Sequence, residues 1–229
     1  AAVETEDARD AGDTAAGMAP PADTPRVLFR QAVEDQRLGR RPQAIAGYRQ
    51  ALKLRPTYWE AAYNLGTLQL SAGDPGEAIG VLAGAVNLAG GEKKARTLYN
   101  LGLAYVRVGM LLNAEKVFLQ AINLSPASLK ARASLAEVYR KTDRPKEAAR
   151  SYREALRLDE GFTPAHFGLA LLDLEAGQRE RAAEKLEKAV ALNPAYEQAR
   201  QQLAVLLLEK GEVERARSQL EYIVENSET

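Results

Sequence analysis

The sequence predicts an all-α fold, a right-handed superhelical solenoid built from helical hairpins. Three observations predict it. From Pro25 onward the chain repeats with a period of 34 residues, a spacing typical of stacked repeats. Small residues recur at fixed positions of the repeat, as is needed where two helix axes approach closely. A helix-breaking segment near the middle of each repeat divides it into two helices.

The period divides the chain into six units, and we expect residues 25–229 to form one six-repeat domain. The predicted units are residues 25–58, 59–94, 95–128, 129–162, 163–196 and 197–229. The second unit has an insertion of two residues within Gly90–Lys94, which we expect to be a flexible loop. This insertion explains why the tetrapeptide YNLG at residues 63–66 recurs 36 residues later and not 34.

Each unit is expected to begin with one helix and, after a break, to end with a second. The central segments, in chain order, are GRRPQA, GDPGEA, GMLLNA, DRPKEA, GQRERA and GEVERA. Glycine ends the first helix in five of them, and Asp143 takes its place in the fourth. Pro56, Pro126 and Pro194 end the second helices of the first, third and fifth units, since proline cannot continue a helix.

Three positions of the repeat carry small residues. Position 8, on the first helix, has Ala32, Gly66, Gly102, Ala136, Ala170 and Ala204. Position 20, on the second helix, has Ala44, Ala78, Ala114, Ala148, Ala182 and Ala216. Position 27 has Ala51, Ala85, Ala121, Ala155 and Ala189, followed by Ile223. Larger side chains lie between them, so each hairpin has an apolar face that only a neighbouring hairpin can cover.

The first 24 residues differ in composition from the rest. They are rich in Ala, Gly, Pro and acidic residues and carry almost no large apolar side chain. Such a segment buries too little surface to offset its ordering entropy, so we expect residues 1–24 to be a disordered acidic linker. The linker and the Ala/Arg/Gly-rich composition favour a bacterial protein in the periplasm or tethered in the cell envelope over a cytoplasmic one.

Composition argues against several functions. The 31 Lys and Arg residues balance 31 Asp and Glu residues, so no strong basic charge predicts nucleic-acid binding. No apolar run approaches the ~18 residues that span a bilayer. There is no cysteine, and the single histidine, His166, lies beside Leu169 and Ala170 on a packing face, where a structural role is expected. Without an acid–base pair, a metal-ligand spacing or a phosphate loop, we expect no enzyme, cofactor or metal.

The repeat resembles the tetratricopeptide repeat (TPR) over residues 25–229. The shared features are Gly or Ala at position 8, Ala at 20, an aromatic residue or Leu at 24, Ala at 27 and Pro at 32. The sequence departs from the family pattern at Asp35, Gln69, Gly90, Glu160, Asp173, Leu207 and Ile223. These departures concern local geometry and leave the predicted fold unchanged.

The resemblance implies that the first helices line a concave groove in which a partner peptide or helix binds. The partner-binding residues that it predicts are Phe29, Arg30, Tyr63, Asn64, Arg96, Tyr99, Asn100, Leu103, Arg107 and Lys130. Peptide-binding members use an asparagine at position 6 to hydrogen-bond the peptide backbone, and Asn64 and Asn100 match it. The alternative is that these asparagines only follow the repeat consensus and stay solvated.

Charges in the predicted groove suggest an acidic ligand. Arg96 and Lys130, with Arg107, Arg140 and Lys141, make its middle basic. Some family members clamp a terminal carboxylate with five residues, and only Asn64, Arg96 and Asn100 match that clamp. Phe29 and Val33 stand where the clamp requires Lys and Asn. The complete clamp is therefore absent, and a solvated charged surface is the alternative.

The sequence thus predicts a non-catalytic scaffold or adaptor for protein–protein interaction, acting in the bacterial cell envelope or in secretion or assembly machinery. The alternative is a structural assembly module that self-associates or packs into a larger complex. The last unit lacks the solvating helix that commonly follows such arrays, so we expect another element or another copy to cover it.

Overall fold

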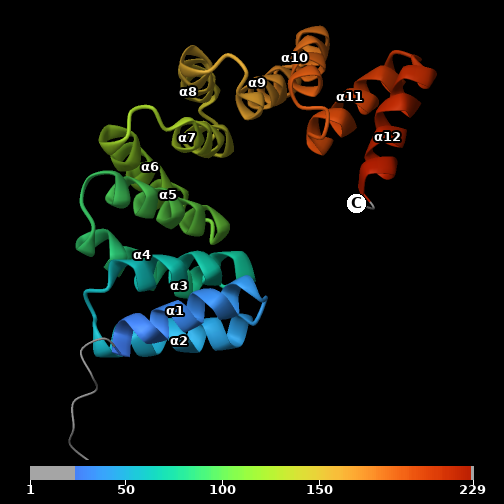
Figure 1. The fold of residues 1–229 in the computed structure, drawn as a ribbon. Helices are drawn as coiled ribbons and strands as arrows, with labels where there is room; N and C mark the ends of the chain where they lie inside the picture. Colours follow the sequence, from blue (N-terminus) through green and yellow to red (C-terminus); the bar gives the residue numbers. More distant parts are fainter. Residues whose placement is uncertain (1–23, 228–229) are drawn as a thin grey trace, which may run out of the picture. The chain divides into compact units, whose positions relative to one another are not determined.

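The computed structural model describes residues 24–227, which form twelve α-helices and no strand (Figure 1). The linker predicted at residues 1–24 lies outside this range except for Thr24, the first residue of α1. The helices are α1 Thr24–Arg37, α2 Arg41–Leu54, α3 Trp59–Ala72, α4 Pro75–Leu88, α5 Gly91–Arg107, α6 Leu111–Leu124, α7 Leu129–Lys141, α8 Pro145–Leu158, α9 Thr163–Glu175, α10 Arg179–Leu192, α11 Glu197–Glu209 and α12 Val213–Ser227. The described residues divide into two compact units, which meet between Ala61 and Ala62.

In the first unit, α1 and α2 pack together as a hairpin. Ala32, Ala44 and Tyr48 are completely buried at its centre. The Tyr48 hydroxyl donates a hydrogen bond of 2.8 Å to the side-chain oxygen of Gln36. The Phe29 ring lies 5.8 Å from that of Tyr48, so an aromatic contact adds to the packing of the hairpin.

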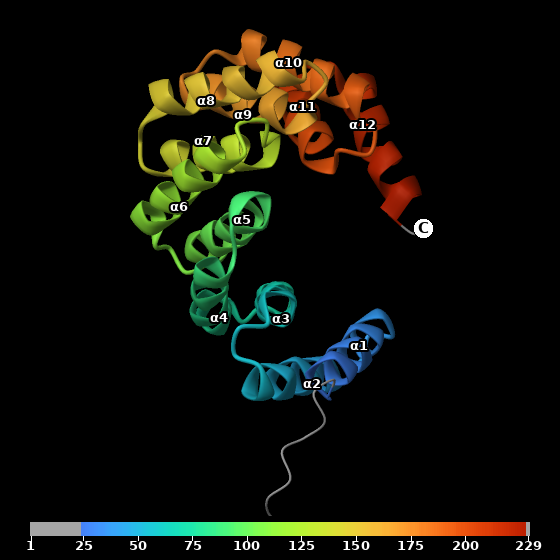
Figure 2. The same ribbon diagram turned by 60° about the vertical axis from the view of Figure 1, so that its left-hand side comes forward.

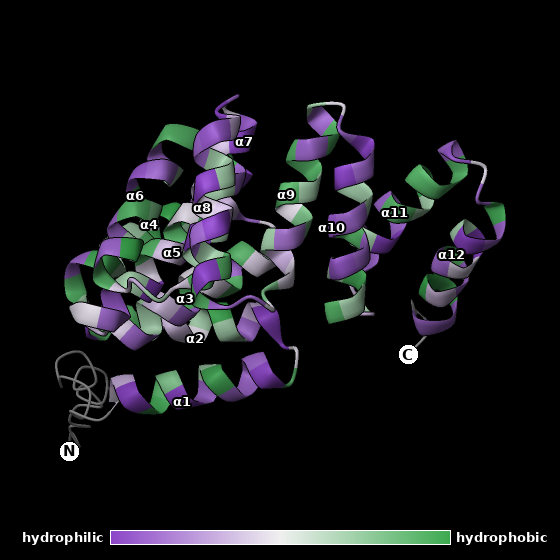
Figure 3. Cartoon of the chain, turned by 90° about the horizontal axis from the view of Figure 1, so that it is seen from above, coloured by the Kyte–Doolittle hydropathy of each residue, from purple (hydrophilic) through white to green (hydrophobic). Residues whose placement is uncertain are grey.

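In the second unit the helices follow one another as hairpins. The pairs α5–α6, α7–α8, α9–α10 and α11–α12 pack within themselves, and α6–α7, α8–α9 and α10–α11 join consecutive pairs. These neighbours lie side by side in two views (Figure 1 and Figure 2). Hydrophobic and hydrophilic residues are interleaved along the helices, as one-sided burial requires (Figure 3). The predicted all-α solenoid of helical hairpins is confirmed.

The small residues of the repeat lie where the sequence predicts close helix packing. All six alanines at position 20 are completely buried. A Cβ atom on Gly66 would lie 2.5 Å from Cγ of Leu82, and one on Gly102 would lie 2.4 Å from Cε1 of Phe118. Leu82 and Phe118 are the large residues at position 24 of the same units. The first helix can therefore approach the second only because position 8 is small.

The breaks between paired helices also agree with the sequence. Gly39, Gly73, Gly109, Gly177 and Gly211 have φ between 72° and 94°, which favours glycine. Asp143 takes the same place in the fourth unit with φ of 55°, a conformation that Asp tolerates better than most residues. One expectation is wrong: Gly91–Lys94 is not a loop but the first turn of α5, because Glu92, Lys93 and Lys94 are all good helix formers.

The polar residues that depart from the family pattern find partners within their own hairpins. Asp35 is buried and lies 3.6 Å from a guanidinium nitrogen of Arg40. Gln69 is buried and donates a 2.6 Å hydrogen bond to the Glu77 carboxylate. The Asp173 carboxylate pairs with Lys185 of α10. Asp35, Gln69 and Asp173 are tolerated as polar residues because the following helix or turn supplies a hydrogen-bonding group to each of them.

Candidate functional site

A pocket of about 590 Å³ lies among the helices of the second unit. It contains five of the ten predicted partner-binding residues. These are Tyr63, Arg96, Tyr99, Asn100 and Lys130. Its remaining wall consists of Glu92, Ala95, Ala121, Ser125, Ala127, Ser128, Leu129 and Phe162. The pocket therefore joins residues of α3, α5 and α7 to two of the loops that connect hairpins.

Asn100 and Tyr63 hold each other in place within this pocket. The Asn100 side-chain amide donates a hydrogen bond of 3.0 Å to the Tyr63 hydroxyl, which joins α5 to α3. Both residues are half-buried. The Asn100 side-chain oxygen has no hydrogen-bond donor among the described residues, so it remains available to accept an N–H from a ligand.

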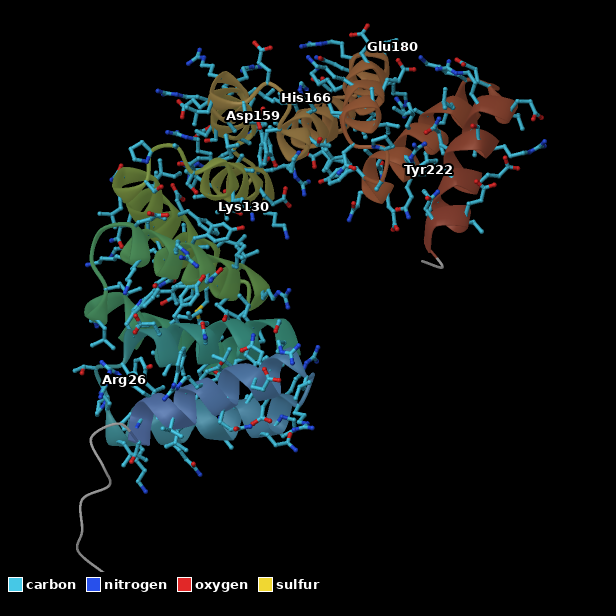
Figure 4. All side chains as sticks on the ribbon, in the orientation of Figure 1. Arg26, Lys130, Asp159, His166, Glu180 and Tyr222 are labelled. Atoms are coloured by element: carbon cyan, nitrogen blue, oxygen red, sulfur yellow. The ribbon has the colours of Figure 1, made fainter. Side chains whose placement is uncertain are left out.

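Two cations line the pocket. The Arg96 guanidinium lies 5.4 Å from the centre of the Tyr63 ring, a cation–π contact that orients an otherwise exposed side chain. Lys130 is exposed at the second residue of α7 (Figure 4). Neither forms an ion pair with any residue that the structure describes. Glu92 is the single carboxylate in the wall, so the pocket has an excess of positive charge.

The other predicted residues lie elsewhere. Asn64 is half-buried and lines none of the described pockets, and its backbone carbonyl accepts a hydrogen bond from the Thr67 hydroxyl at 2.9 Å. Arg107 donates a 3.0 Å hydrogen bond to the backbone carbonyl of Leu70, so it ties α5 to the last turn of α3. Phe29 and Arg30 belong to the first unit, where Phe29 packs with aromatic residues and Arg30 is exposed.

Two of the five residues expected to make the groove basic, Arg140 and Lys141, are paired with carboxylates and add no net positive charge. Arg140 pairs with Glu137 of its own helix at 2.7 Å and with Glu175 of α9. Lys141 lies 3.8 Å from the same Glu137 carboxylate. The hydrogen bonds that Arg140 donates to the Glu137 carboxylate raise the pKa of Arg140 above its usual range, and Glu175 makes a smaller contribution. These cations are compensated, which leaves Arg96 and Lys130 as the unpaired positive groups at the candidate site.

A second pocket, called here the apolar pocket, has a volume of about 270 Å³. It includes the predicted residue Leu103. Its other lining residues are Val106, Ala133, Ser134, Glu137, Tyr152, Pro164, Phe167, Gly168, Leu171 and Tyr196. Sequence reasoning assigned no binding role to Tyr152, Gly168 or Tyr196. A glycine inside the helical segment FGLA was the signal that could have drawn attention to this place.

Burial raises the pKa of two tyrosines at the apolar pocket. The pKa of Tyr152 is raised above its usual range mainly by burial and secondly by the negative charge of Glu137. Burial alone raises the pKa of Tyr196. Both phenols are therefore neutral around pH 7, and both residues line the pocket without charge.

His166 has a structural role, as the sequence predicts. It is only 7% exposed on α9, and its Nε2 lies 2.9 Å from the backbone carbonyl of Glu160 in the preceding loop (Figure 4). Within residues 24–227, no three His, Asp or Glu side chains are grouped so that they could hold a metal ion. No helix in that same range combines the length and the apolar character that crossing a membrane requires.

The fold is a helical-repeat solenoid, and the two pockets lie between its hairpins. Four sequence models described as tetratricopeptide repeat match the chain, at residues 29–93, 95–128, 131–163 and 173–226. The chain belongs to the tetratricopeptide repeat family, whose members are generally non-catalytic scaffolds for protein–protein interaction. No protein of curated function matches its sequence.

Several solved structures resemble the chain. MamA is 25% identical, with 71% of this chain and 94% of that chain covered and a TM-score of 0.65. TTC0263, a thermophilic TPR protein of Thermus thermophilus, is also 25% identical. The match covers 80% of this chain and 99% of that chain, with a TM-score of 0.64. YrrB, described as a TPR protein with an unusual peptide-binding site, is 21% identical. The match covers 75% of this chain and 88% of that chain, with a TM-score of 0.62. These likenesses support the fold.

Proposed function

We propose that the chain is a non-catalytic adaptor that binds an extended acidic segment of a partner protein. The proposed site is the pocket of about 590 Å³ that contains Arg96, Asn100 and Lys130, called here the acidic-ligand pocket. The observation that carries the proposal is that Arg96 and Lys130, both without ion-pair partners among the described residues, line one pocket with the Asn100 amide. The structure named for an unusual peptide-binding site, YrrB, shares the fold and gives the proposal a precedent. Composition favours a setting in the bacterial cell envelope or its assembly machinery.

The pocket offers three kinds of contact to such a segment. A carboxylate would accept charge-assisted hydrogen bonds from Arg96 and Lys130, each contributing about 1.5–3 kcal/mol. The Asn100 side-chain oxygen would accept a backbone N–H of the ligand. The half-buried rings of Tyr63 and Tyr99 would cover an apolar portion of it. Asn64, which lies outside the pocket, has no direct part in this arrangement.

Selection from a peptide-display library tests the proposal. The wild-type chain should enrich peptides that carry Asp or Glu. The double variant Arg96→Glu, Lys130→Glu should lose that preference and enrich basic peptides, because the charge of the pocket is then reversed. The matched control is Lys188→Glu, Lys210→Glu, which changes net charge equally at exposed positions outside the pocket. If both double variants select the same peptides as the wild type, the acidic-ligand pocket is not the binding site.

Assembly is the second candidate function, and one surface favours it. Leu208, Val213, Leu220 and Val224 are each between 42% and 65% exposed and line a groove of about 500 Å³ on α11 and α12. Exposed apolar patches of this kind often mark interaction surfaces. Sedimentation at two protein concentrations should then show self-association that Leu220→Glu, Val224→Glu abolishes. A monomer at both concentrations would exclude self-association through this groove.

A further inference from the structure

The apolar pocket differs in chemistry from the acidic-ligand pocket. Its walls are formed by Leu103 and Val106 of α5, by Ala133 of α7 and by Phe167 and Leu171 of α9. All five are half-buried, so part of each side chain remains accessible. Its volume of about 270 Å³ is below the ~300–1,000 Å³ of pockets that hold whole small molecules. It suits one side chain of a larger ligand.

Fixed neighbours keep the apolar pocket open. A Cβ atom on Gly168 would lie 2.1 Å from Cζ of Tyr152, so the tyrosine ring rests directly on the α9 backbone and forms the pocket floor. The Phe167 and Tyr196 rings lie 5.3 Å apart at 77°, an edge-to-face contact. Arg140 bridges Glu137 of α7 and Glu175 of α9. A preformed pocket of this kind binds without the cost of ordering its walls.

The charge state of the apolar pocket favours an uncharged occupant. Three aromatic residues and one carboxylate could in principle attract a cation. However, Glu137 already pairs with Arg140 and lies 3.8 Å from the Lys141 ammonium. A cationic side chain would meet those two positive charges and would lose hydration. An aliphatic side chain carries no charge whose desolvation would cost free energy, and burying its apolar surface is favourable.

On both α5 and α7, the residues that line the two pockets are about one helical turn apart. Tyr99 lines the acidic-ligand pocket and Leu103 the apolar pocket, four residues along α5. Lys130 and Ser134 have the same relation on α7. Four residues of helix advance about 6 Å, at ~1.5 Å per residue. An extended segment advances ~3.3 Å per residue, so it covers this separation in about two residues.

We propose that the apolar pocket is a second subsite, which takes an aliphatic side chain two or three residues from the acidic group held by Arg96 and Lys130. This inference rests on the proposed function, and it names the ligand as an extended segment that pairs an acid with Leu, Ile or Val at that spacing. Because the two pockets are offset by four residues on both α5 and α7, the site should recognise the distance between the two ligand side chains as well as their chemical types.

Synthetic host peptides of Gly and Ser test the inference by NMR titration of the isotope-labelled chain, which detects weak binding. One peptide carries a single Glu, and the others add one Leu at one, two, three or six residues from it on either side. Leu at two or three residues should tighten binding about tenfold over the Glu-only peptide. Only those peptides should shift the signals of Gly168 and Leu171.

Two variants separate the inference from the proposed function. Ser134→Phe, which fills the apolar pocket, should remove the gain from Leu while leaving the Glu-only peptide unchanged. Arg96→Glu, Lys130→Glu should weaken every peptide. If the Glu-only peptide binds at Arg96 and Lys130 but Leu adds the same affinity at every spacing or none at all, the second subsite is wrong and the proposed function stands. If no peptide binds, both are contradicted.

Discussion

Tyr152 illustrates how a single residue pair shapes this molecule. Its ring is almost completely buried and lies against Gly168, so the two helices α8 and α9 meet with no side chain between ring and backbone. The ring also forms part of the apolar pocket. One glycine thus serves both the packing of two hairpins and the shape of a candidate binding site.

We predict that Gly168→Ala destabilises the chain by about 1–3 kcal/mol, because the added methyl group overlaps the buried Tyr152 ring and forces it or α9 to move. Urea denaturation followed by circular dichroism measures the change. The matched control is Gly80→Ala in α4, where no atom lies within 4 Å of the new Cβ. That variant should be stabilised by up to about 1 kcal/mol through helix propensity. Equal effects of the two variants would show that the contact with Tyr152 is unimportant.

Individual site residues were harder to predict than packing residues. Asn64 and Asn100 share the same repeat position, yet only Asn100 lines the acidic-ligand pocket. Repeat position gives the face of a helix, whereas a pocket depends on which neighbouring side chains fill the space beside that face. Arg140 is a second case: it was expected to make the groove basic, but Glu137 of its own helix and Glu175 of the next repeat compensate its charge.

At the scale of a helix, the pattern of small residues carries most of the information about the fold. The period predicted close helix contacts at position 20, and all six alanines there are buried. The glycines and Asp143 predicted to end the first helices have the expected positive φ. The sequence misled at Gly90–Lys94, because an insertion next to two glycines is also compatible with an extra helical turn, which helix-forming residues then favoured.

Two alanines of α10 provide a direct test of this packing argument. Ala189 is completely buried, whereas Ala191, two residues later, is exposed. Ala189→Leu should lower stability by about 1–3 kcal/mol, because the larger side chain must separate α10 from the helices packed on it. Ala191→Leu should change it by less than about 0.5 kcal/mol. Thermal or urea unfolding of both variants measures the difference. Comparable values would mean that α10 has room to accommodate a larger residue at position 27.

At the scale of the whole molecule, three tyrosines with raised pKa values contribute to the dependence of stability on pH in alkali. Burial is the main cause of the raised pKa of Tyr139, Tyr152 and Tyr196. In the unfolded chain these phenols ionise near their ordinary pKa of 10.0. Above that pH the unfolded state binds fewer protons than the folded state, so raising the pH shifts the equilibrium toward unfolding.

We therefore predict that the contribution of these tyrosines to the free energy of unfolding is constant well below pH 10. Above pH 10 this contribution should decrease with increasing pH until the phenols of the folded protein also ionise. Tyr152, the most buried of the three, should contribute up to about 1.4 kcal/mol per pH unit within that window. Urea midpoints measured at increasing alkaline pH give the slope. Tyr152→Phe removes the ionisable group and keeps the ring, so its slope should be shallower than that of the wild type by this amount. Lysine titration affects both proteins equally and cancels in the comparison. Identical slopes would mean that the Tyr152 hydroxyl is reached by solvent, which contradicts a closed contact between its ring and the α9 backbone.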